Sequence, residues 1–476
     1  MKAFCWFVKQ SIISSTVLGQ VVLWNISKRY DVGNIRHLVN SGPSFKTDIK
    51  NDLTQGGYFA TVNIGTPGQE LTLQLDTGSS DVWVPSASAS ICHDKREGGC
   101  SLGSFDPTQS STFSDVGKNL FQISYLDKSS STGDYFTDRI QLGPDSLENF
   151  TMGLGTATSV SYGLVGVGYV NNEASADTIQ QLYPNLPVAL ANAKLINTVA
   201  YSLWLNDLDA STGNILFGGV DTEEFIGPLT RIPILLDKTA NNYTSFMVSL
   251  YSIEASSSSG HDILTTQELP LPVVLDSGTS LSFLPPDLVD QVWAEVGAKY
   301  DEDVGLALLP CAAANSEGYF SFTFSGPLGP RINVTMAELV FQLSGGSPKP
   351  KSGHHRGKSV CGFGISKQSA PPYLLGDTFL RSAYVVYDLV NNEIGIAQTN
   401  FNSTKSNVVA FASRGATIPS ATAAPDYDGS VPPQPTQTDL NAAKGFQDVE
   451  NVAIFPNPRS GPGLTVIIMA VAFALL

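Results

Sequence analysis

Two stretches of this 476-residue chain hold an aspartate in nearly the same surroundings. Residues 75–80 read LDTGSS and residues 275–280 read LDSGTS, so that Asp76 and Asp276 lie 200 residues apart. In both stretches, apolar residues typical of a strand lead into the aspartate, and a glycine-containing turn follows. Two copies separated by the length of a domain indicate a duplicated lobe in which each half supplies one carboxyl group. A pair of unrelated Asx turns is the alternative interpretation.

Two carboxyl groups presented from related turns can carry out acid–base chemistry together. A few ångströms apart at low effective dielectric they cannot both ionise cheaply, so they share one proton. The ionised group can take a proton from a bound water, which then attacks a peptide carbonyl, while the protonated group hydrogen-bonds the carbonyl oxygen. This chemistry needs no metal, no cofactor and no covalent intermediate. The pair titrates as one system, so the sequence does not show which aspartate holds the proton.

The strands that must position the aspartates are also visible in the sequence. Residues 71–75 alternate leucine with polar residues, as in a half-buried strand, and residues 273–275 (VVL) read as the end of a buried strand. An apolar-apolar-glycine motif follows each aspartate, at residues 164–166 (LVG) and at residues 374–376 (LLG). This second repeat predicts that the chain crosses closely behind each aspartate loop, at a glycine.

The composition is that of an all-β protein. The 43 glycines and 28 prolines are spread through the chain, strand patterns recur and long helical periodicities are scarce. One helix is expected after Pro286, with Leu288, Val292 and Val296 on a stripe that faces the core. The formal net charge of −16 argues against nucleic acid as a partner. So many carboxyl groups also suit function at low pH.

Five cysteines are present, and Cys5 lies in an apolar N-terminal stretch, which leaves four for the mature chain. Four cysteines allow three disulfide connectivities. Local pairing is the simplest of these, and it joins Cys92 to Cys100 and Cys311 to Cys361. Metal binding is the competing interpretation, but the sequence has no cysteine or histidine spacing that supports it.

The N-terminal region is interpreted as targeting and processing sequence. Residues 1–19 read as an imperfect signal peptide. The basic pair Lys28-Arg29 precedes a polar, irregular segment that ends near Asp52. Residues 20–52 are therefore expected to be a short pro-segment that is cut by a dibasic processing enzyme. A solvated basic pair without a processing role is the alternative. Two catalytic lobes are then expected at residues 53–225 and 226–402.

The C-terminal region is expected to hold the protein at a membrane. Residues 403–450 are rich in serine, threonine, proline and alanine, and this composition predicts an extended stalk. The apolar run Leu464–Leu476 in the tail 451–476 is short for a membrane span, which needs about 20 residues. Together with the polar stretch before it, this run is typical of a signal for a glycosylphosphatidylinositol (GPI) anchor, with Asn441 or Asn451 as the attachment residue.

Asn-x-Ser/Thr sequons fit a secretory route. They lie at Asn25 and, in the expected mature chain, at Asn149, Asn242, Asn333 and Asn402. We therefore expect a glycoprotein that is anchored to the membrane outside the cell, at the plasma membrane or cell wall.

The chain resembles the pepsin-type aspartic endopeptidases, and among them the surface-anchored yapsin-type branch of fungi. The resemblance runs from about Gly57 to Asn400. It includes both aspartate loops, Trp83, the hairpin residue Tyr125, both apolar-apolar-glycine motifs and the cysteines at 311 and 361. It implies two β lobes with a deep cleft between them and a protein or peptide substrate bound there in extended form. We expect a monomer that works without a cofactor.

The resemblance also implies roles for single residues. Asp76 and Asp276 would be the catalytic pair. The neighbouring hydroxyl residues would support the loops, with Thr77 and Ser277 bracing one loop against the other, and Ser79 and Thr279 hydrogen-bonding the outer carboxylate oxygens. Tyr125 and Asp127 would belong to a flap that closes over the bound peptide.

Two features leave alternatives open. Flaps of this family commonly have glycine at the positions of Leu126 and Lys128, so the geometry of the flap tip is unsettled by the sequence. A catalytically silent homologue that binds peptides in the same cleft is the second functional hypothesis. Both aspartates and their supporting hydroxyl groups are present, which favours an active enzyme.

Overall fold

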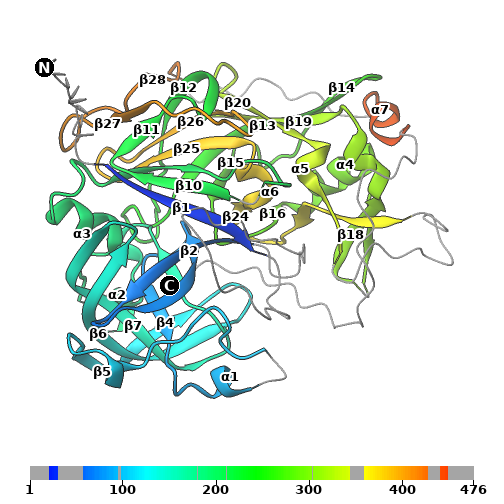
Figure 1. The fold of residues 1–476 in the computed structure, drawn as a ribbon. Helices are drawn as coiled ribbons and strands as arrows, with labels where there is room; N and C mark the ends of the chain where they lie inside the picture. Colours follow the sequence, from blue (N-terminus) through cyan, green and yellow to red (C-terminus); the bar gives the residue numbers. More distant parts are fainter. Residues whose placement is uncertain are drawn as a thin grey trace, which may run out of the picture.

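The computed structural model describes residues 21–29, 57–94, 98–178, 181–210, 212–302, 304–343, 359–426 and 440–448. Strands dominate this part of the chain, and the helices are short (Figure 1). The strands build two lobes and one large sheet that joins them. The predicted all-β fold with two lobes is therefore confirmed. The expected signal peptide and the tail 451–476 lie outside the described residues.

The first lobe contains a closed barrel. In order around the barrel, the strands are β2 (Gly57–Ile64), β3 (Gln69–Asp76), β8 (Leu164–Gly166), β4 (Val82–Pro85), β7 (Asp145–Thr158) and β6 (Ser130–Leu142). The barrel closes because Ile64 of β2 pairs with Ile140 of β6. Strand β5 (Ser114–Ser124) continues the sheet beyond β6 as a long hairpin. Short helices fill the connections: α1 (Ser90–His93), η3 (Pro107–Gln109), η4 (Val170–Asn172), α2 (Ala174–Thr178) and α3 (Leu186–Asn192).

A continuous sheet joins the two halves of the chain. Besides β1 and β28, which are described below, its strands are β9 (Ala200–Trp204), β10 (Thr212–Phe217), β12 (Phe225–Pro233), β25 (Ala383–Asp388) and β26 (Glu393–Thr399). Tyr387 of β25, from the second half, pairs with Tyr201 of β9, from the first. This pairing joins the two lobes through one sheet.

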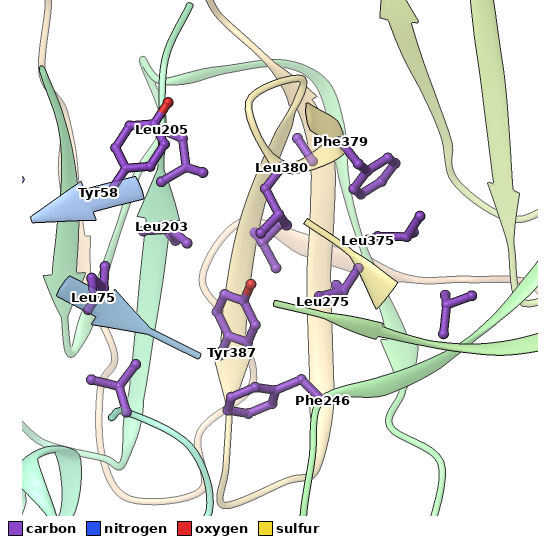
Figure 2. Packing of buried hydrophobic residues seen from close by; sticks show 14 of the residues in the cluster. Tyr58, Leu75, Leu203, Leu205, Phe246, Leu275, Leu375, Phe379, Leu380 and Tyr387 are labelled. Carbon is purple, nitrogen blue, oxygen red and sulfur yellow. The ribbon is translucent and has the colours of Figure 1, made fainter. Parts of the chain in front are cut away.

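One core extends across the junction of the lobes (Figure 2). Leu75 and Leu275, which precede the two aspartates, are fully buried in it. Phe246 and Tyr387 lie beside them and meet edge to face, with ring centroids 4.6 Å apart. Because both leucines are buried in this core, the backbone positions of the aspartates that follow them are fixed.

The second lobe consists of a large and a small sheet. The large one contains β13 (Met247–Ser257), β14 (Gly260–Leu264), β15 (Leu271–Leu275), β16 (Ser282–Leu284), β19 (Tyr319–Phe324), β20 (Arg331–Thr335), β23 (Ile365–Lys367) and β24 (Tyr373–Leu375). The small one contains β17 (Lys299–Asp301), β18 (Leu306–Pro310), β21 (Val340–Phe341) and β22 (Val360–Phe363). Short helices η5 (Cys311–Asn315) and α5 (Met336–Leu339) connect them, and α6 (Asp377–Leu380) leads from β24 to β25 of the joining sheet.

The expected helix is α4 (Pro286–Val296). Leu288, Val292 and Val296 are all buried, as the apolar stripe predicts. The helix ends at Gly297, whose φ of 71° lies in the left-handed region that glycine adopts without a steric penalty.

Part of the expected pro-segment is a strand of the shared sheet. Strand β1 (Val22–Arg29) lies between β10 and β2 and buries Val22, Trp24 and Ile26. Lys28 is only 2% exposed, and its Nζ donates to the backbone carbonyl of Leu208. The interpretation of a solvated basic pair is therefore wrong for Lys28. Residues 30–52 of the expected pro-segment lie outside the described residues.

Parts of the expected stalk are folded against the body, so the stalk prediction is wrong for them. Strand β27 (Val408–Ala410) pairs with β11 (Gly219–Asp221), and β28 (Ala421–Ala423) runs parallel to β12. Helix α7 (Ala443–Gln447) packs on the second lobe. The composition of this region is mostly polar, but a few buried apolar side chains are enough to hold it against the body of the protein. Phe411, Ile418 and Phe446 are buried in this way.

Residues 427–439 of the expected stalk lie outside the described residues, as does Asn451. Among the residues that the structure does describe, no helix is long and apolar enough to cross a membrane.

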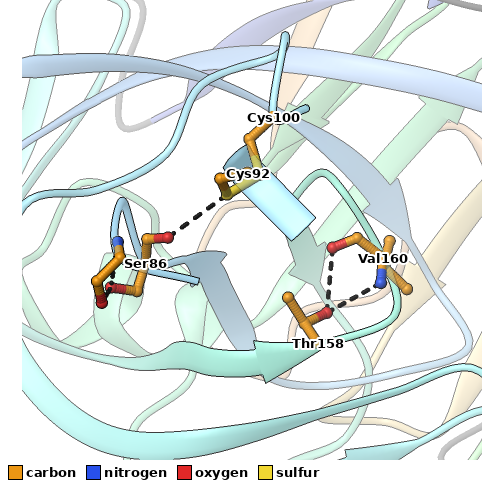
Figure 3. Close-up of a disulfide and its surroundings, with 6 residues drawn as sticks. Ser86, Cys92, Cys100, Thr158 and Val160 are labelled. Atoms are coloured by element: carbon orange, nitrogen blue, oxygen red, sulfur yellow. Dashed lines mark hydrogen bonds between the residues drawn. A yellow bond between two sulfur atoms is a disulfide. The ribbon is translucent and has the colours of Figure 1, made fainter. Parts of the chain in front are cut away.

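The described residues contain two disulfides, and they are the local pairs favoured by the sequence. Cys92–Cys100 closes a short loop beside the end of β4, where Cys92 Sγ lies 3.4 Å from the carbonyl oxygen of Ser86 (Figure 3). Cys311–Cys361 ties η5 to β22 across a sequence separation of 50 residues. Each disulfide stays within one lobe, so the lobes are held to each other by the shared sheet and core.

Candidate active site

Strands β3 and β15 bring the two aspartate loops together at the junction of the lobes. Behind each loop a parallel strand crosses, β8 behind Asp76 and β24 behind Asp276. A Cβ added to Gly166 would lie 2.6 Å from backbone atoms of Ser80, and one added to Gly376 would lie 2.2 Å from the carbonyl oxygen of Thr279. The predicted close crossing at glycine is thus confirmed in both lobes.

The two carboxyl groups receive the same set of hydrogen bonds. Gly78 N–H donates to Asp76 Oδ1 at 2.8 Å, and Gly278 N–H donates to Asp276 Oδ1 at 2.9 Å. The other oxygen of each aspartate accepts from a hydroxyl group: Ser79 Oγ donates to Asp76 Oδ2, and Thr279 Oγ1 donates to Asp276 Oδ2 at 2.5 Å. These donors orient both carboxyl groups.

The loops are also bonded to each other in a symmetric way. Thr77 Oγ1 accepts from the N–H of Ser277 at 2.9 Å and donates to the carbonyl of Leu275 at 3.0 Å. Ser277 Oγ accepts from the N–H of Thr77 and donates to the carbonyl of Leu75, both at 3.2 Å. All four bonds are buried and cross the lobe junction. They hold the two aspartates in a fixed relation.

Burial dominates the electrostatics of the pair. Both aspartates are 0% exposed, and their side chains hydrogen-bond each other. Burial raises the pKa of Asp76 to about 6, against the hydrogen bonds from Ser79 and Gly78, which favour the ionised form. Burial, and then the charge of Asp76, raise the pKa of Asp276 well above its usual value. The pair therefore keeps a proton at a pH where a solvated aspartic acid has lost it.

A family model described as eukaryotic aspartyl protease matches residues 57–399, which span both loops and both lobes. The chain belongs to this family. Over 366 residues this aspartyl protease is 42% identical to a protein of Aspergillus fumigatus named probable aspartic-type endopeptidase opsB, and the alignment covers 77% of this chain and 73% of that protein. Secreted aspartic protease 8 of Candida albicans is 36% identical over 374 residues, covering 78% and 79% of the two chains.

The similarity extends to a solved structure. An aspartic proteinase from Irpex lacteus superimposes with a TM-score of 0.56 at 22% identity, covering 74% of this chain and 96% of that one. At this identity the match shows the fold alone. The family model and the names of the relatives confirm the enzyme class predicted from the sequence, an aspartic-type endopeptidase.

In this aspartyl protease, Tyr125 begins the turn between β5 and β6. Its hydroxyl oxygen accepts from Trp83 Nε1 at 2.7 Å, and its side chain is fully buried. Burial and the nearby charge of Asp76 raise the pKa of Tyr125 well above its usual value. The tyrosine is therefore packed near the aspartate pair rather than standing at an exposed tip.

The turn contains Leu126 and Lys128 at the positions where flaps of the family commonly have glycine. Lys128 has a φ of 70°, in the region that disfavours side chains with a Cβ. Asp127 Oδ1 accepts from the N–H of Ser129 at 2.8 Å, so this carboxylate shapes the turn. Asp127 is thus placed in the hairpin but not in the aspartate pair.

A buried hydrogen-bond network that the sequence does not predict lies behind the first loop. Asp81 accepts hydrogen bonds from the hydroxyl of Tyr183 at 2.7 Å, the hydroxyl of Tyr135 at 3.2 Å and the N–H of Ala174 at 2.8 Å. Glu173 lies beside this network, and burial raises its pKa to about 9. Nothing in the spacing of these residues predicts that they meet.

A second buried network lies beside the second loop and includes Lys28 of β1. Arg381 Nε donates to Glu338 Oε2 at 2.5 Å, and the N–H of Asp377 donates to the carbonyl of Thr279 at 2.8 Å. Burial raises the pKa of Asp377 well above its usual value, while the charges of Arg381 and Lys28 oppose that rise. Burial lowers the pKa of Lys28. The N-terminal strand thus contributes a basic side chain to the buried network beside the second loop.

Proposed function

We propose that the protein hydrolyses peptide bonds by means of a water activated by Asp76 and Asp276. The observation that carries this proposal is the buried pair itself, in which two mutually bonded carboxyl groups receive matching donors and retain a proton. The ionised carboxylate takes a proton from the water, the oxygen attacks the peptide carbonyl, and the protonated carboxyl donates to the carbonyl oxygen. As the tetrahedral intermediate collapses, the nitrogen takes a proton and the C–N bond breaks, which returns the pair to one shared proton.

The test is cleavage of a peptide library by the purified protein and by its Asp76→Asn and Asp276→Asn variants. We expect both variants to lose at least about a thousandfold in kcat. A statine-type transition-state mimic should inhibit the wild type. An Asp290→Asn variant, changed at an exposed ion pair with Lys367, serves as the control and should keep full activity. Comparable turnover by the Asp276→Asn variant would refute the mechanism.

We further propose that activity is weighted to the acidic side. The pair must keep one proton, and it loses that proton as the pH rises through its higher pKa. Burial raises the pKa of Asp276 well above its usual value, which supports retention of the proton at a pH where a solvated aspartic acid has lost it. Activity should therefore fall at alkaline pH.

We propose that the enzyme is a secreted, surface-anchored member of the yapsin-like branch, with a signal peptide at 1–19 and a pro-segment at 20–52. The disulfides suit an oxidising compartment. The sequons at Asn149, Asn242, Asn333 and Asn402 are all exposed, which glycosylation requires. A relative named secreted aspartic protease 8 also supports secretion.

For the GPI anchor we propose attachment at Asn451 rather than at Asn441. Asn441 Nδ2 donates to Asp262 Oδ1 at 2.8 Å, and its carbonyl accepts from Ser259 Oγ at 2.6 Å, so this residue is held in the folded lobe. Asn451 lies after the last described residue and leaves a spacer of suitable length before the apolar run that begins at Leu464.

Phospholipase treatment of intact cells should release the wild type. It should release an Asn441→Gln variant equally, whereas an Asn451→Gln variant should not acquire the anchor. If the protein stays on the membrane after treatment, the anchor proposal is wrong.

A further inference from the structure

One aspartate of the second lobe, Asp262 on β14, binds the segment 440–448 that contains α7. Its side chain is only 3% exposed. Asp262 Oδ1 accepts a hydrogen bond from Asn441 Nδ2 at 2.8 Å, and Oδ2 accepts one from the N–H of Ala442 at 2.7 Å. Both oxygens of this carboxylate therefore hold the segment, which lies at the edge of the second lobe beside β14 and α4 (Figure 1).

Few other contacts attach the segment. Ala442 and Phe446 are fully buried, and Ser257 Oγ in the serine-rich turn after β13 donates to the carbonyl of Ala442 at 2.6 Å. The space for the aromatic ring exists because residue 318 is glycine: a Cβ on Gly318 would lie 2.3 Å from Cε1 of Phe446. Because the attached segment is so short, the two hydrogen bonds to Asp262 are a large part of what holds it.

A second acid lies beside Asp262. Glu295 of α4 is 0% exposed, and its carboxyl group lies next to that of Asp262. The oxygens of Glu295 have no other hydrogen-bond partner among the described residues. Gln447 Nε2 donates to the backbone carbonyl of Glu295 at 2.9 Å, so the segment also contacts the turn of α4 that carries this acid. Asp262 and Glu295 thus form a buried acid pair at the base of the segment.

The elements packed around the acid pair carry other charged or titratable side chains: Glu254 of β13, His261 of β14, Asp287 and Asp290 of α4, Lys367 of β23, and Lys444 and Asp448 of α7. Those of β13 and β14 lie on the opposite face of the hairpin from Asp262, since side chains alternate along a strand. Asp287 lies in the first turn of α4, Lys367 pairs with Asp290 at 2.5 Å, and the two side chains of α7 are exposed. The charge that acts on Glu295 is that of Asp262.

The acid pair keeps one proton while it is buried. Burial, and then the charge of Asp262, raise the pKa of Glu295 to about 8. Below this pH the protonated Glu295 donates to Asp262, whose charge attracts the donors of Asn441 and Ala442. Above it both acids are ionised, and like charges so close together repel each other strongly in a buried place. Release of the segment gives water access to both carboxylates and relieves this repulsion.

We propose that the segment 440–448 is a pH-sensitive latch, which is docked on the second lobe while the Asp262–Glu295 pair holds a proton and is released when both acids are ionised. A carboxyl group with a raised pKa in the docked state binds its proton more tightly there, so docking is strongest in acid. It weakens as the pH rises from the pKa of a solvated glutamic acid, about 4.3, to the docked value of about 8. This inference does not depend on the peptidase reaction.

On an anchored enzyme the latch would set the length of the tether to the membrane. Three residues lead from Asp448 to Asn451, the proposed attachment residue, and they reach about 10 Å at most. After release the free chain would begin beyond Asp426, and its 25 residues reach at most about 85 Å. This consequence rests on the proposed GPI anchor, whereas the latch itself does not.

The test is hydrogen exchange of the purified full-length protein between about pH 5 and pH 8.5, with each rate divided by the intrinsic exchange rate at that pH. Protection of residues 443–448 measures docking, and protection of β25 reports on the global fold. Three variants are compared with the wild type. Glu295→Gln resembles the protonated acid, Asp262→Asn keeps only one of two acceptors, and Glu317→Gln is the control at an exposed residue next to Gly318.

In the wild type and in Glu317→Gln, protection of residues 443–448 should fall at least about tenfold between these pH values, while β25 stays protected. Glu295→Gln should keep the same protection at both. Asp262→Asn should lose protection already at the lower pH, because the segment supplies two donors and asparagine accepts only one of them.

Equal protection of residues 443–448 at both pH values in the wild type would overturn the latch. A parallel loss of protection in β25 would overturn it too, because the whole protein would then unfold. So would a fall in folded Glu295→Gln as large as in the wild type. If Glu295→Gln does not fold, Asp262→Asn decides: full protection of its residues 443–448 at the lower pH would show that the acid pair does not hold the segment. None of these measurements involves peptide cleavage, so they leave the proposed peptidase function to its own test.

Discussion

At the scale of single residues, the acid pair depends on its donors as much as on its two carboxyl groups. Each aspartate accepts hydrogen bonds from the backbone and from a hydroxyl group, and Thr77 and Ser277 connect the two loops. The hydroxyl of Ser277 is used twice, as an acceptor and as a donor. Its removal should therefore act on both stability and catalysis.

We predict that Ser277→Ala lowers the free energy of unfolding by about 1–3 kcal/mol, because it leaves a buried N–H and a buried carbonyl without their partner. The kcat should fall as well, since the loops are then free to shift. Chemical denaturation and steady-state kinetics measure the two effects. Ser111→Ala is the matched control, because Ser111 Oγ donates to the carbonyl of Thr66 at an exposed site. A Ser277→Ala enzyme with the stability and activity of that control would contradict the bracing role.

At the scale of secondary-structure elements, the β5–β6 hairpin and helix α7 depart most from expectation. The hairpin holds Tyr125 in a buried aromatic cluster, and its turn places Lys128 in the left-handed region. Residues 403–450 are predicted to be a stalk, but they contribute the strands β27 and β28 to the body. In α7, Phe446 stacks on Phe320 with ring centroids 5.2 Å apart.

We predict that Lys128→Gly stabilises the enzyme by up to about 1 kcal/mol, because glycine adopts a φ of 70° without the steric penalty of a Cβ. The midpoint of urea unfolding measures this. Lys118→Gly on the neighbouring strand β5 is the control, and there glycine should destabilise. A loss of stability in Lys128→Gly would show that the turn differs from the one described.

We predict that Phe446→Ala costs about 3 kcal/mol of docking free energy and detaches α7 from the second lobe. Hydrogen exchange should then show loss of protection at residues 443–448, and a protease should cut there. Lys444→Ala changes an exposed residue of the same helix and should leave it docked. Fast exchange of the amide hydrogens of residues 443–448 in the wild type would contradict the docking of α7 and support the stalk prediction for these residues.

At the scale of the whole molecule, buried acids make stability depend on pH. Burial raises the pKa of Glu173 to about 9 and that of Glu224 to about 8, far above their values in the unfolded chain. A carboxyl group whose folded-state pKa is raised binds its proton more tightly when folded, so its contribution is complete below the unfolded pKa and is lost as the pH rises through the folded one. Stability should thus decline between about pH 4 and pH 9, in the same direction as the proposed activity.

We predict that Glu173→Gln flattens this decline. Glutamine resembles the protonated acid, so the variant should match the wild type near pH 5 and gain stability relative to it up to about pH 9. Thermal unfolding across this range provides the measurement. The lowered pKa of Lys28 makes stability rise with pH, but it affects the wild type and the variant equally. The difference in stability between the two proteins therefore reports on Glu173. Parallel curves for the two proteins would contradict the assignment.

The class of fold and the two aspartate loops could be predicted from the amino-acid sequence, because each repeat of the local pattern 200 residues apart lies within a short segment. The glycines behind the loops and the stripe of α4 were predictable for the same reason. Contacts between segments that are distant in the sequence became known only from the fold. Lys28 joined a buried charge network, Gln74 reached Gly278, and α7 docked through Phe446. Such contacts depend on which surfaces the fold brings together, and neither spacing nor composition records that.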